Sequence, residues 1–357
     1  MADDKTSKLP APIAASSGLE TLDDFVHYTQ PFAAGKRVVG NMLYGINHNR
    51  KMLIIPESRD DFGYVFFTRP QLNLSRSNIR NSRLFSNMLT KDPYSIHGYA
   101  RNILDPRLNA VGEGHPLVDP LNVFIPVFSN AILKMSGWPD TVAPTMTSKE
   151  GVRKEQYSMI DGTTEINGTF DLDVTFRVFA DEPVTQIMES WVRYPSLVFE
   201  GVFNPYLDYV VENTIDYNTR IYRLVMTDDG RYVKKIAATG ASFPLNDQAG
   251  RSFDYTNETP YNDQNKEVTY RFRSMGAIYN DPKLVDAFNS AVGIFHGGMR
   301  NINKGLKTNM IKVPIDLIGI SNFRGYPRIN PSTYELEWYV TTAELAAYQT
   351  IGTLIEQ

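Results

Sequence analysis

Two aspartates, Asp171 and Asp173, stand two residues apart in a stretch where apolar and polar side chains alternate. Residues two apart in a β-strand share one face, and two carboxylates close together are the arrangement that glycoside hydrolases use for acid and base catalysis. The other residues of this face are polar side chains typical of a solvated surface: Asn167, Thr169, Thr175 and Arg177. We therefore interpret Asp171 and Asp173 as surface residues and predict no catalytic pair.

No other spacing in the sequence indicates a cofactor, metal or nucleophile site. The five histidines lie far apart and form no HExxH motif: His27, His48, His97, His115 and His296. The chain has no cysteine, which excludes disulfides and thiolate metal sites. Gly297 and Gly298, followed by Lys304, lack the order of a phosphate-binding loop, and we interpret these glycines as a helix stop. The sequence therefore predicts a protein that is not an enzyme, with no catalytic, cofactor-binding or metal-binding residues.

Tyrosines are frequent in the middle of the chain, where they could form a platform for a sugar ring. They are Tyr206, Tyr209, Tyr217, Tyr222 and Tyr232. Aromatic side chains more often pack between strands or at subunit contacts. A strand-rich module that binds or cleaves carbohydrate stays open as an alternative function.

The composition favours a large, strand-rich chain with many loops. Its 357 residues include 20 tyrosines, 19 phenylalanines and 21 prolines; aromatic residues are enriched in strands, whereas proline favours turns. The 36 basic and 40 acidic residues leave a net charge of −4, which argues against nucleic acid as the main partner. No apolar run reaches transmembrane length, and residues 1–20 lack the apolar core of a signal peptide. We therefore expect no membrane association.

The stretch from 157 to 240 has the clearest periodicity and forms the expected core. Apolar residues alternate along Ile166–Val178, which predicts a long strand with one buried face. A helical stripe follows and predicts helix 183–194, which Pro195 ends. The other predicted elements are a strand at Ser196–Phe203 and a hairpin of Thr219–Met226 and Arg231–Thr239.

Shorter elements precede this core. Gly63–Thr68 is an apolar run that Arg69 and Pro70 end, which predicts a strand. The other expected elements are a strand pair within 22–56, a helix at Asn78–Leu89, a long loop at 90–118, a broken or late-starting helix within Leu121–Met135, and a connector at Gly137–Lys149.

The C-terminal part follows a long polar loop expected at 241–265. Glu267–Arg273 alternates as a strand, and Asp281 with Pro282 begins a helix that ends near Gly293. The last predicted elements are a strand at Tyr334–Val340, a capping box of Thr341 and Glu344, and a helix at Thr342–Ile355.

These elements divide the chain into four expected regions. They are an extended N-terminal arm (1–20), an N-terminal α+β region (21–145), a core with helix 183–194 (146–280), and a C-terminal helix–strand–helix region that packs on this core (281–357). The predicted fold class is α+β and strand-rich, with an antiparallel β-sandwich or barrel-like core and flanking helices.

Three stretches resemble the virion structural proteins of large tailed bacteriophages, more specifically the tail proteins of contractile-tailed phages. They are GYVFFTRPQLNLS (63–75), YSMIDGTTEINGTFDLDVTFR (157–177) and RYVKKIAATGASFPLN (231–246), and the resemblance spans most of 36–280. Tail-tube and tube-like proteins of this kind carry a β-sandwich with a flanking helix. They form rings, usually sixfold, whose long strands line a channel.

The resemblance implies a structural subunit of a phage virion, assembled in the cytoplasm of the bacterial host. Its implied partners are further copies of itself in a ring, other tail proteins of the sheath, baseplate or neck, and DNA that passes through the channel. The family offers no catalytic residue. A neck or capsid connector protein and the carbohydrate module remain the alternatives.

Overall fold

The computed structural model describes residues 63–90, 92, 94–162, 168–227, 229–254, 257–258, 266–318 and 324–355. The expected N-terminal arm, the strand pair within 22–56, and Ile166 and Asn167 of the predicted long strand lie outside the described residues. Each helix in the described part is too short or too polar to cross a bilayer.

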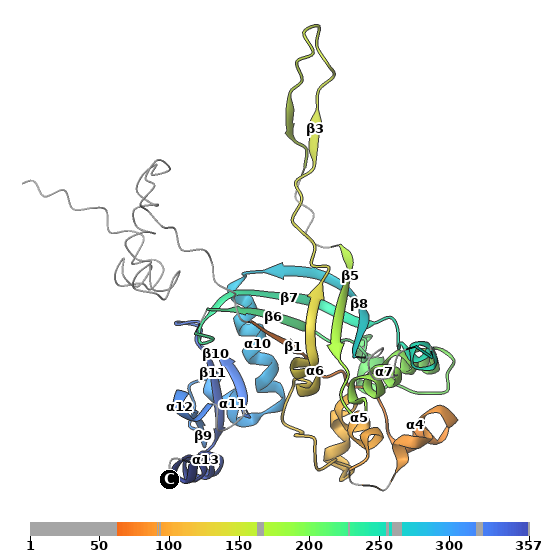
Figure 1. Ribbon diagram of the computed structural model, residues 1–357, viewed down its shortest axis with the longest axis vertical. Coiled ribbons are helices and arrows are strands. Elements are labelled where there is room, and N and C mark those ends of the chain that lie inside the picture. The colour runs from red at the N-terminus through yellow and green to blue at the C-terminus, as the bar shows by residue number, and fades with distance from the viewer. Residues whose placement is uncertain are drawn as a thin grey trace, which may run out of the picture.

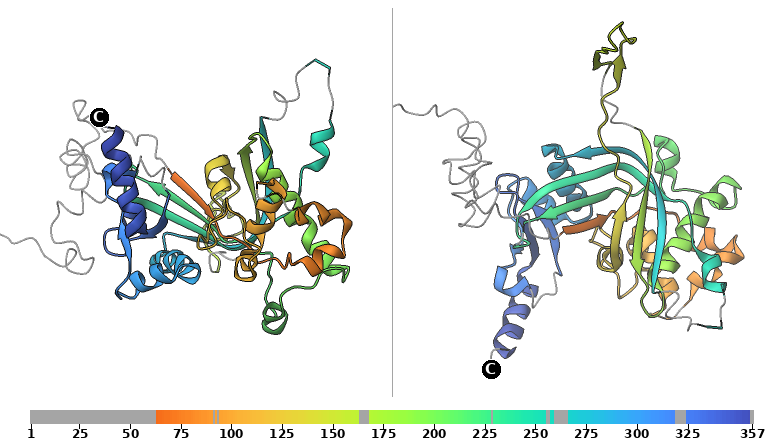
Figure 2. Two further views of the ribbon diagram at one scale, coloured as in Figure 1. Left: turned by 90° about the horizontal axis from the view of Figure 1, so that it is seen from below. Right: turned by 45° about the horizontal axis from the view of Figure 1, so that its top comes forward.

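A six-stranded antiparallel sheet forms the centre of the described structure, with the strand order β1-β6-β7-β8-β5-β2. The strands are β1 (Gly63–Phe67), β2 (Ile132–Ser136), β5 (Thr169–Arg177), β6 (Ile221–Met226), β7 (Val233–Pro244) and β8 (Glu267–Tyr279). Figures 1 and 2 show this sheet as a curled arch with helices packed around it. The predicted α+β fold with an antiparallel, barrel-like core and flanking helices is confirmed, in the form of a curled half-barrel.

The predicted long strand is β5, and its neighbour β8 has the same two-sided pattern. Leu172 pairs with Phe272 and Val174 with Tyr270, and all four side chains are fully buried. Intervening residues such as Asp173 point to the opposite face, as the period of two requires.

The predicted hairpin is formed by β6 and β7, and Gly230 in its loop has the positive φ of 67° that such a turn favours. Both β7 and β8 are longer than predicted, because they pair with each other from Ala237 and Tyr279 to Pro244 and Phe272. The expected loop at 241–265 is therefore ordered at its start, where β7 reaches Pro244. It also contains a 3-10 helix, η3 (Ala249–Phe253).

One hydrophobic core lies between β5, β8 and three helices, α5 (Ile96–Leu104), α6 (Pro126–Ala131) and α7 (Pro183–Phe199). Trp191 of α7 stacks on Phe128 of α6 with a centroid distance of 6.5 Å, and its indole N–H donates to the Tyr217 carbonyl at 2.8 Å. Phe67 of β1 contacts Phe128 and Phe272 in the same core. The two ends of the curled sheet therefore share one core.

Helix α7 passes through Pro195, where the sequence predicted its end. Tyr194 and Leu197, on either side of the proline, are buried in the first core, and burial of large side chains offsets the backbone hydrogen bond that proline cannot make. The predicted strand at Ser196–Phe203 is therefore wrong. These residues form the last turns of α7 and a turn in which Phe203 N–H donates to the Leu197 carbonyl at 3.1 Å.

The N-terminal helices differ from the prediction in two ways. The expected helix at Asn78–Leu89 is split into α4 (Arg76–Arg80) and the 3-10 helix η1 (Arg83–Leu89), because Ser82 is extended. The expected loop at 90–118 instead contains α5 and the 3-10 helix η2 (Pro106–Val111). Burial explains α5, since its apolar side chains point into the first core at helical spacing: Ala100, Ile103 and Leu104.

The segment predicted as a broken or late-starting helix contains both a helix and a strand. Helix α6 begins at Pro126, which suits a first turn. From Ile132 the chain continues as the edge strand β2. Beyond it, β3 (Thr145–Thr147) lies in the expected connector and pairs with β4 (Ser158–Ile160) in a separate hairpin.

A second core lies between α10 (Pro282–Phe295), α11 (Gly297–Asn303) and strands β1, β6 and β7. Phe288 of α10 contacts Phe66 and Tyr222, each at a centroid distance of 5.3 Å. Asp281 caps α10 as predicted, but the interpretation of the glycine pair as a helix stop is wrong. His296 Nδ1 accepts from Met299 N–H at 3.3 Å and begins α11 directly before the glycines.

The C-terminal part adds a three-stranded sheet, β10-β11-β9, and two helices. The elements are β9 (Met310–Lys312), α12 (Ile315–Ile318), β10 (Tyr326–Ile329), β11 (Leu336–Thr341) and α13 (Thr342–Ile355). Strand β11 starts two residues later than predicted, because Tyr334 has a positive φ of 56°. The capping box is confirmed: Thr341 N–H donates to Glu344 Oε2 at 2.9 Å and Glu344 N–H to Thr341 Oγ1 at 3.3 Å.

Candidate assembly surfaces

The two aspartates that resembled a catalytic pair are held in ion pairs across β5 and β8. Asp173 accepts from Arg271 Nε at 2.8 Å, and Asp171 accepts from Arg273. These pairs lie on the face opposite the first core, where Thr175 and Thr269 also share a hydrogen bond of 2.9 Å. Each carboxylate therefore meets a guanidinium of the neighbouring strand, and the face is polar with balanced charge.

The histidines are not brought together. His115 and His296 are mostly buried in different parts of the fold, and burial lowers the pKa of each imidazole. His97 lines a small hollow with Glu189 and Arg193, while His27 and His48 lie outside the described residues. Among the described residues, no group of three or more acids and histidines is placed to hold a metal ion.

The five tyrosines lie in separate environments. Tyr222 is buried in the second core, and Tyr217 meets Phe243 edge-on at 5.8 Å. Tyr206 and Tyr209 stack on Arg107, whereas Tyr232 lies beside Arg231. A single aromatic platform for a sugar is therefore not formed by these residues.

The most prominent surface feature is the β3–β4 hairpin, which projects far from the body of the molecule (Figure 1). Met146 pairs with Met159, and Ser148 N–H donates to the Tyr157 carbonyl at 2.8 Å. All residues from 141 to 162, here named the hairpin arm, are exposed. A two-stranded hairpin is at best marginally stable in water unless another surface covers it.

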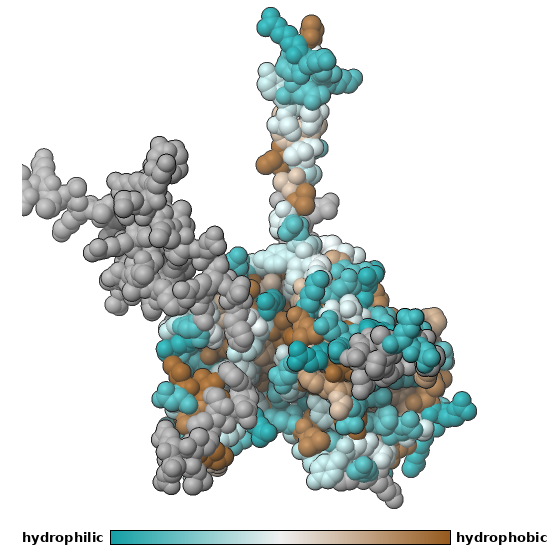
Figure 3. All heavy atoms as spheres, viewed as in Figure 1, coloured by the Kyte–Doolittle hydropathy of each residue, from teal (hydrophilic) through white to brown (hydrophobic). Residues whose placement is uncertain are grey.

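The hairpin arm carries apolar side chains despite its exposure. Six of them are strongly exposed: Val142, Met146, Val152, Tyr157, Met159 and Ile160. Figure 3 shows brown, apolar spheres at several places along an otherwise polar arm. Exposed apolar groups gathered on a projection are typical of a protein-binding surface.

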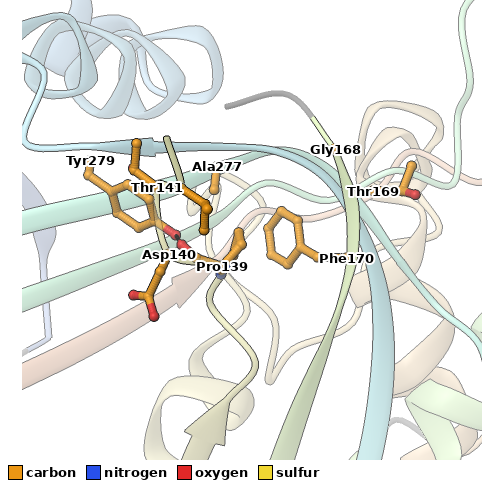
Figure 4. Close-up of a pocket in the computed structure, with 9 residues that line it drawn as sticks. Pro139, Asp140, Thr141, Gly168, Thr169, Phe170, Ala277 and Tyr279 are labelled. Atoms are coloured by element: carbon orange, nitrogen blue, oxygen red, sulfur yellow. Dashed lines mark hydrogen bonds between the residues drawn. The ribbon is translucent and has the colours of Figure 1, made fainter. Parts of the chain in front are cut away.

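Aromatic side chains hold the root of the arm against the sheet. Trp138 lies 6.1 Å from Phe170 of β5 and 6.0 Å from Tyr279 of β8, measured between ring centroids. The Tyr279 hydroxyl donates to the Pro139 carbonyl at 2.5 Å, at the small hollow shown in Figure 4. These contacts fix the point from which the arm leaves the body.

A second exposed apolar surface lies on the short helix α8 (Leu207–Glu212), which the sequence did not predict. Leu207, Val210 and Val211 recur at helical spacing and are 77%, 54% and 72% exposed. These three side chains are here named the α8 stripe. Their i, i+3, i+4 spacing is the signal that could have revealed the helix from the sequence.

Polar groups behind α8 form a buried network that the sequence also did not reveal. The Asp105 carboxylate accepts from Leu74 N–H at 2.9 Å, from Arg107 N–H at 3.1 Å and from the Tyr206 hydroxyl at 2.8 Å. Burial raises the pKa of Asp105 to about 6, although these hydrogen bonds oppose the shift. Nearby, Arg69 donates to the Ile103 carbonyl at 2.9 Å, and burial lowers its pKa to about 10.

The features above are exposed surfaces and the contacts that support them, and the described residues form no recognisable catalytic site. The charged face, the hairpin arm and the α8 stripe are instead suited to contacts with other macromolecules. Comparison with known proteins agrees with this description.

Residues 4–355 match a protein family described as "Putative phage tail tube protein". No curated protein matches the chain. Two solved structures are similar in part. One is the anti-feeding prophage cap (AFP tube terminating cap), 15% identical with a TM-score of 0.25, covering 44% of this chain and 83% of that one.

The other is the sheath/tube terminator of an extracellular contractile injection system, PVC, in its extended state. It is 14% identical with a TM-score of 0.23 and covers 44% of this chain and 87% of that one. Neither similarity is high enough to assign a fold or a role to this chain. The family match spans nearly the whole sequence, so the chain belongs to the phage tail tube protein family and is a structural component of the phage tail and virion.

Proposed function

We propose that this chain is a tail-tube subunit that joins identical copies in a closed ring around a DNA channel. The ring is sixfold by the resemblance seen in the sequence. The observation that carries the proposal is the hairpin arm, which leaves the body with all its residues exposed. A closed ring needs a head-to-tail contact between two different surfaces of each subunit, and an arm that meets the body of a neighbour supplies one.

The balanced charge of the β5–β8 face fits a channel through which DNA moves. Free lysines and arginines would bind phosphates and slow the passage of DNA. Here Arg271 and Arg273 are already paired with Asp173 and Asp171. In the proposed ring this face meets the channel, and its contact with DNA is passive.

The proposal includes assembly in the host cytoplasm and contacts with other tail proteins of the sheath, baseplate or neck. It also includes the absence of enzymatic activity, which the pairing of both candidate aspartates supports.

Negative-stain electron microscopy of the purified chain tests the ring directly. We expect particles with a central hole, or tubes made of stacked rings, over a range of protein concentrations. A uniform population of single subunits at the highest concentration would contradict the proposal. A glycan array serves as the parallel control, since specific glycan binding by such a monomer would favour the carbohydrate module.

A further inference from the structure

The α8 stripe faces solvent because polar contacts hold the other side of the helix. Arg107 donates to both carboxylate oxygens of Asp208, at 3.0 and 2.6 Å. Its guanidinium lies 4.4 Å from the Tyr206 ring centroid and 5.4 Å from that of Tyr209. The Tyr206 hydroxyl in turn donates to the buried Asp105.

These contacts orient α8 before any partner arrives. A surface that is already ordered loses less conformational entropy on binding than a loose one. The contacts on the other side of α8 thus keep Leu207, Val210 and Val211 exposed, and the stripe is suited to bind an apolar surface of a partner.

The charges around the stripe and at the tip of the hairpin arm are of opposite sign. Residues 194–219 contain four acidic residues and no lysine or arginine: Glu200, Asp208, Glu212 and Asp216. Asp208 is paired with Arg107 and Asp216 is buried beside Tyr194. Glu200 and Glu212 are exposed and give the surface of this segment a negative charge.

The loop of the hairpin arm carries an excess of positive charge. It contains three basic residues, Lys149, Arg153 and Lys154, against the two acidic residues Glu150 and Glu155. The arm therefore offers apolar side chains with a basic tip, whereas the α8 segment offers apolar side chains with acidic neighbours. Such complementary charges favour encounter and fix orientation.

We propose that the hairpin arm of one copy of this chain docks on the α8 stripe of a second copy. The arm does not cover the stripe of its own chain, since both are exposed and the arm points away from the body (Figure 1). Met146 and Met159, which lie opposite each other in the hairpin, have the flexible side chains that adapt to such a surface. The inference rests on the proposed self-assembly and adds the receiving surface.

The absence of cysteine makes a direct test possible. One population of the full chain carries Met159→Cys and a second carries Val211→Cys, and the two are mixed, allowed to assemble and oxidised. We expect up to about half of the chains to form covalent dimers that contain one of each variant, because random mixing in a ring brings the two cysteines together at about one contact in four. Leu117→Cys, which replaces another exposed apolar side chain, is the matched control for Val211→Cys and should give almost no dimer with Met159→Cys.

A charge variant provides a second readout. Val211→Lys should strongly reduce assembly, because it places a positive charge where the basic tip of the arm docks, while leaving the melting temperature unchanged, because the side chain is 72% exposed. If ring particles form but Met159→Cys couples to Leu117→Cys as well as to Val211→Cys, or to neither, the docking inference is wrong and the ring stands. If no oligomer forms under any condition, both the inference and the proposed function fail.

Discussion

At the scale of single residues, Asp105 is the most informative side chain in the body of the molecule. It is fully buried and accepts hydrogen bonds from three parts of the chain. The donors are Leu74 in the segment after β1, Arg107 in η2 and Tyr206 directly before α8. Burial raises its pKa to about 6, above its ordinary value of 3.8. An acid with a raised pKa in the folded state binds a proton more tightly when folded, so it stabilises the fold more at low pH than at neutral pH.

Asp105→Asn should therefore change how stability depends on pH. Between about pH 4 and pH 6 the wild-type chain should lose about 3 kcal/mol of unfolding free energy relative to the variant, because the carboxyl ionises in the unfolded chain while the folded carboxyl still holds its proton. Chemical denaturation at a series of pH values measures this difference. Asp208→Asn is the control with the opposite sign, because hydrogen bonds from Arg107 lower the pKa of Asp208 and its contribution is lost as pH falls. A wild-type chain that gains stability over Asp105→Asn as pH rises would contradict this account.

The sequence revealed residues with a repeated pattern and missed those defined by tertiary contacts. Alternation along β5 correctly separated Leu172 and Val174 from the solvated Asp173. The same alternation predicts a buried Phe170, but this side chain is only half-buried. Its ring packs against Trp138, which comes from the root of the arm and could not be placed from the sequence. Arg69 has no local pattern, since its partners lie far away in the sequence. Asp105 caps η2 locally through Arg107, but its other partners, Leu74 and Tyr206, also lie far away.

At the scale of elements, burial decides where local propensity and the structure disagree. Pro195 lies inside α7 because Tyr194 and Leu197 are buried around it. Helix α5 had a readable apolar stripe, but the prolines and glycines around it favoured a loop. The β3–β4 hairpin had no amphipathic period to detect, since neither of its faces is buried within one subunit.

Strand β5 gives the sharpest test of the predicted inside and outside of the sheet. Phe176 is 1% exposed and meets Phe128 at 5.2 Å, so Phe176→Ala should lower the unfolding free energy by about 3–5 kcal/mol through lost burial and a cavity. Asp173→Asn on the opposite face should cost less than about 1 kcal/mol, since it breaks only a surface ion pair. Denaturant titration of both variants measures the contrast, and equal losses would show that the two faces are assigned wrongly.

At the scale of the whole molecule, the chain combines a well-packed body with surfaces that one subunit leaves uncovered. Two cores, which lie on opposite faces of β1 and β6, support the fold of the body. The hairpin arm adds no buried residue to either core. We therefore expect the hairpin arm to be held in place by a neighbouring subunit in the assembled state. Removal of the arm should impair assembly and leave the folding of the subunit intact.

The mass of the assembled particle, measured by native mass spectrometry, tests this central claim most directly. The full chain is compared with a variant in which residues 145–160 are replaced by a short glycine–serine turn. We expect the full chain to form one particle with a fixed number of subunits and the shortened chain to remain a folded monomer with an unchanged melting temperature. The same particle from both chains, or monomers from both, would contradict the account.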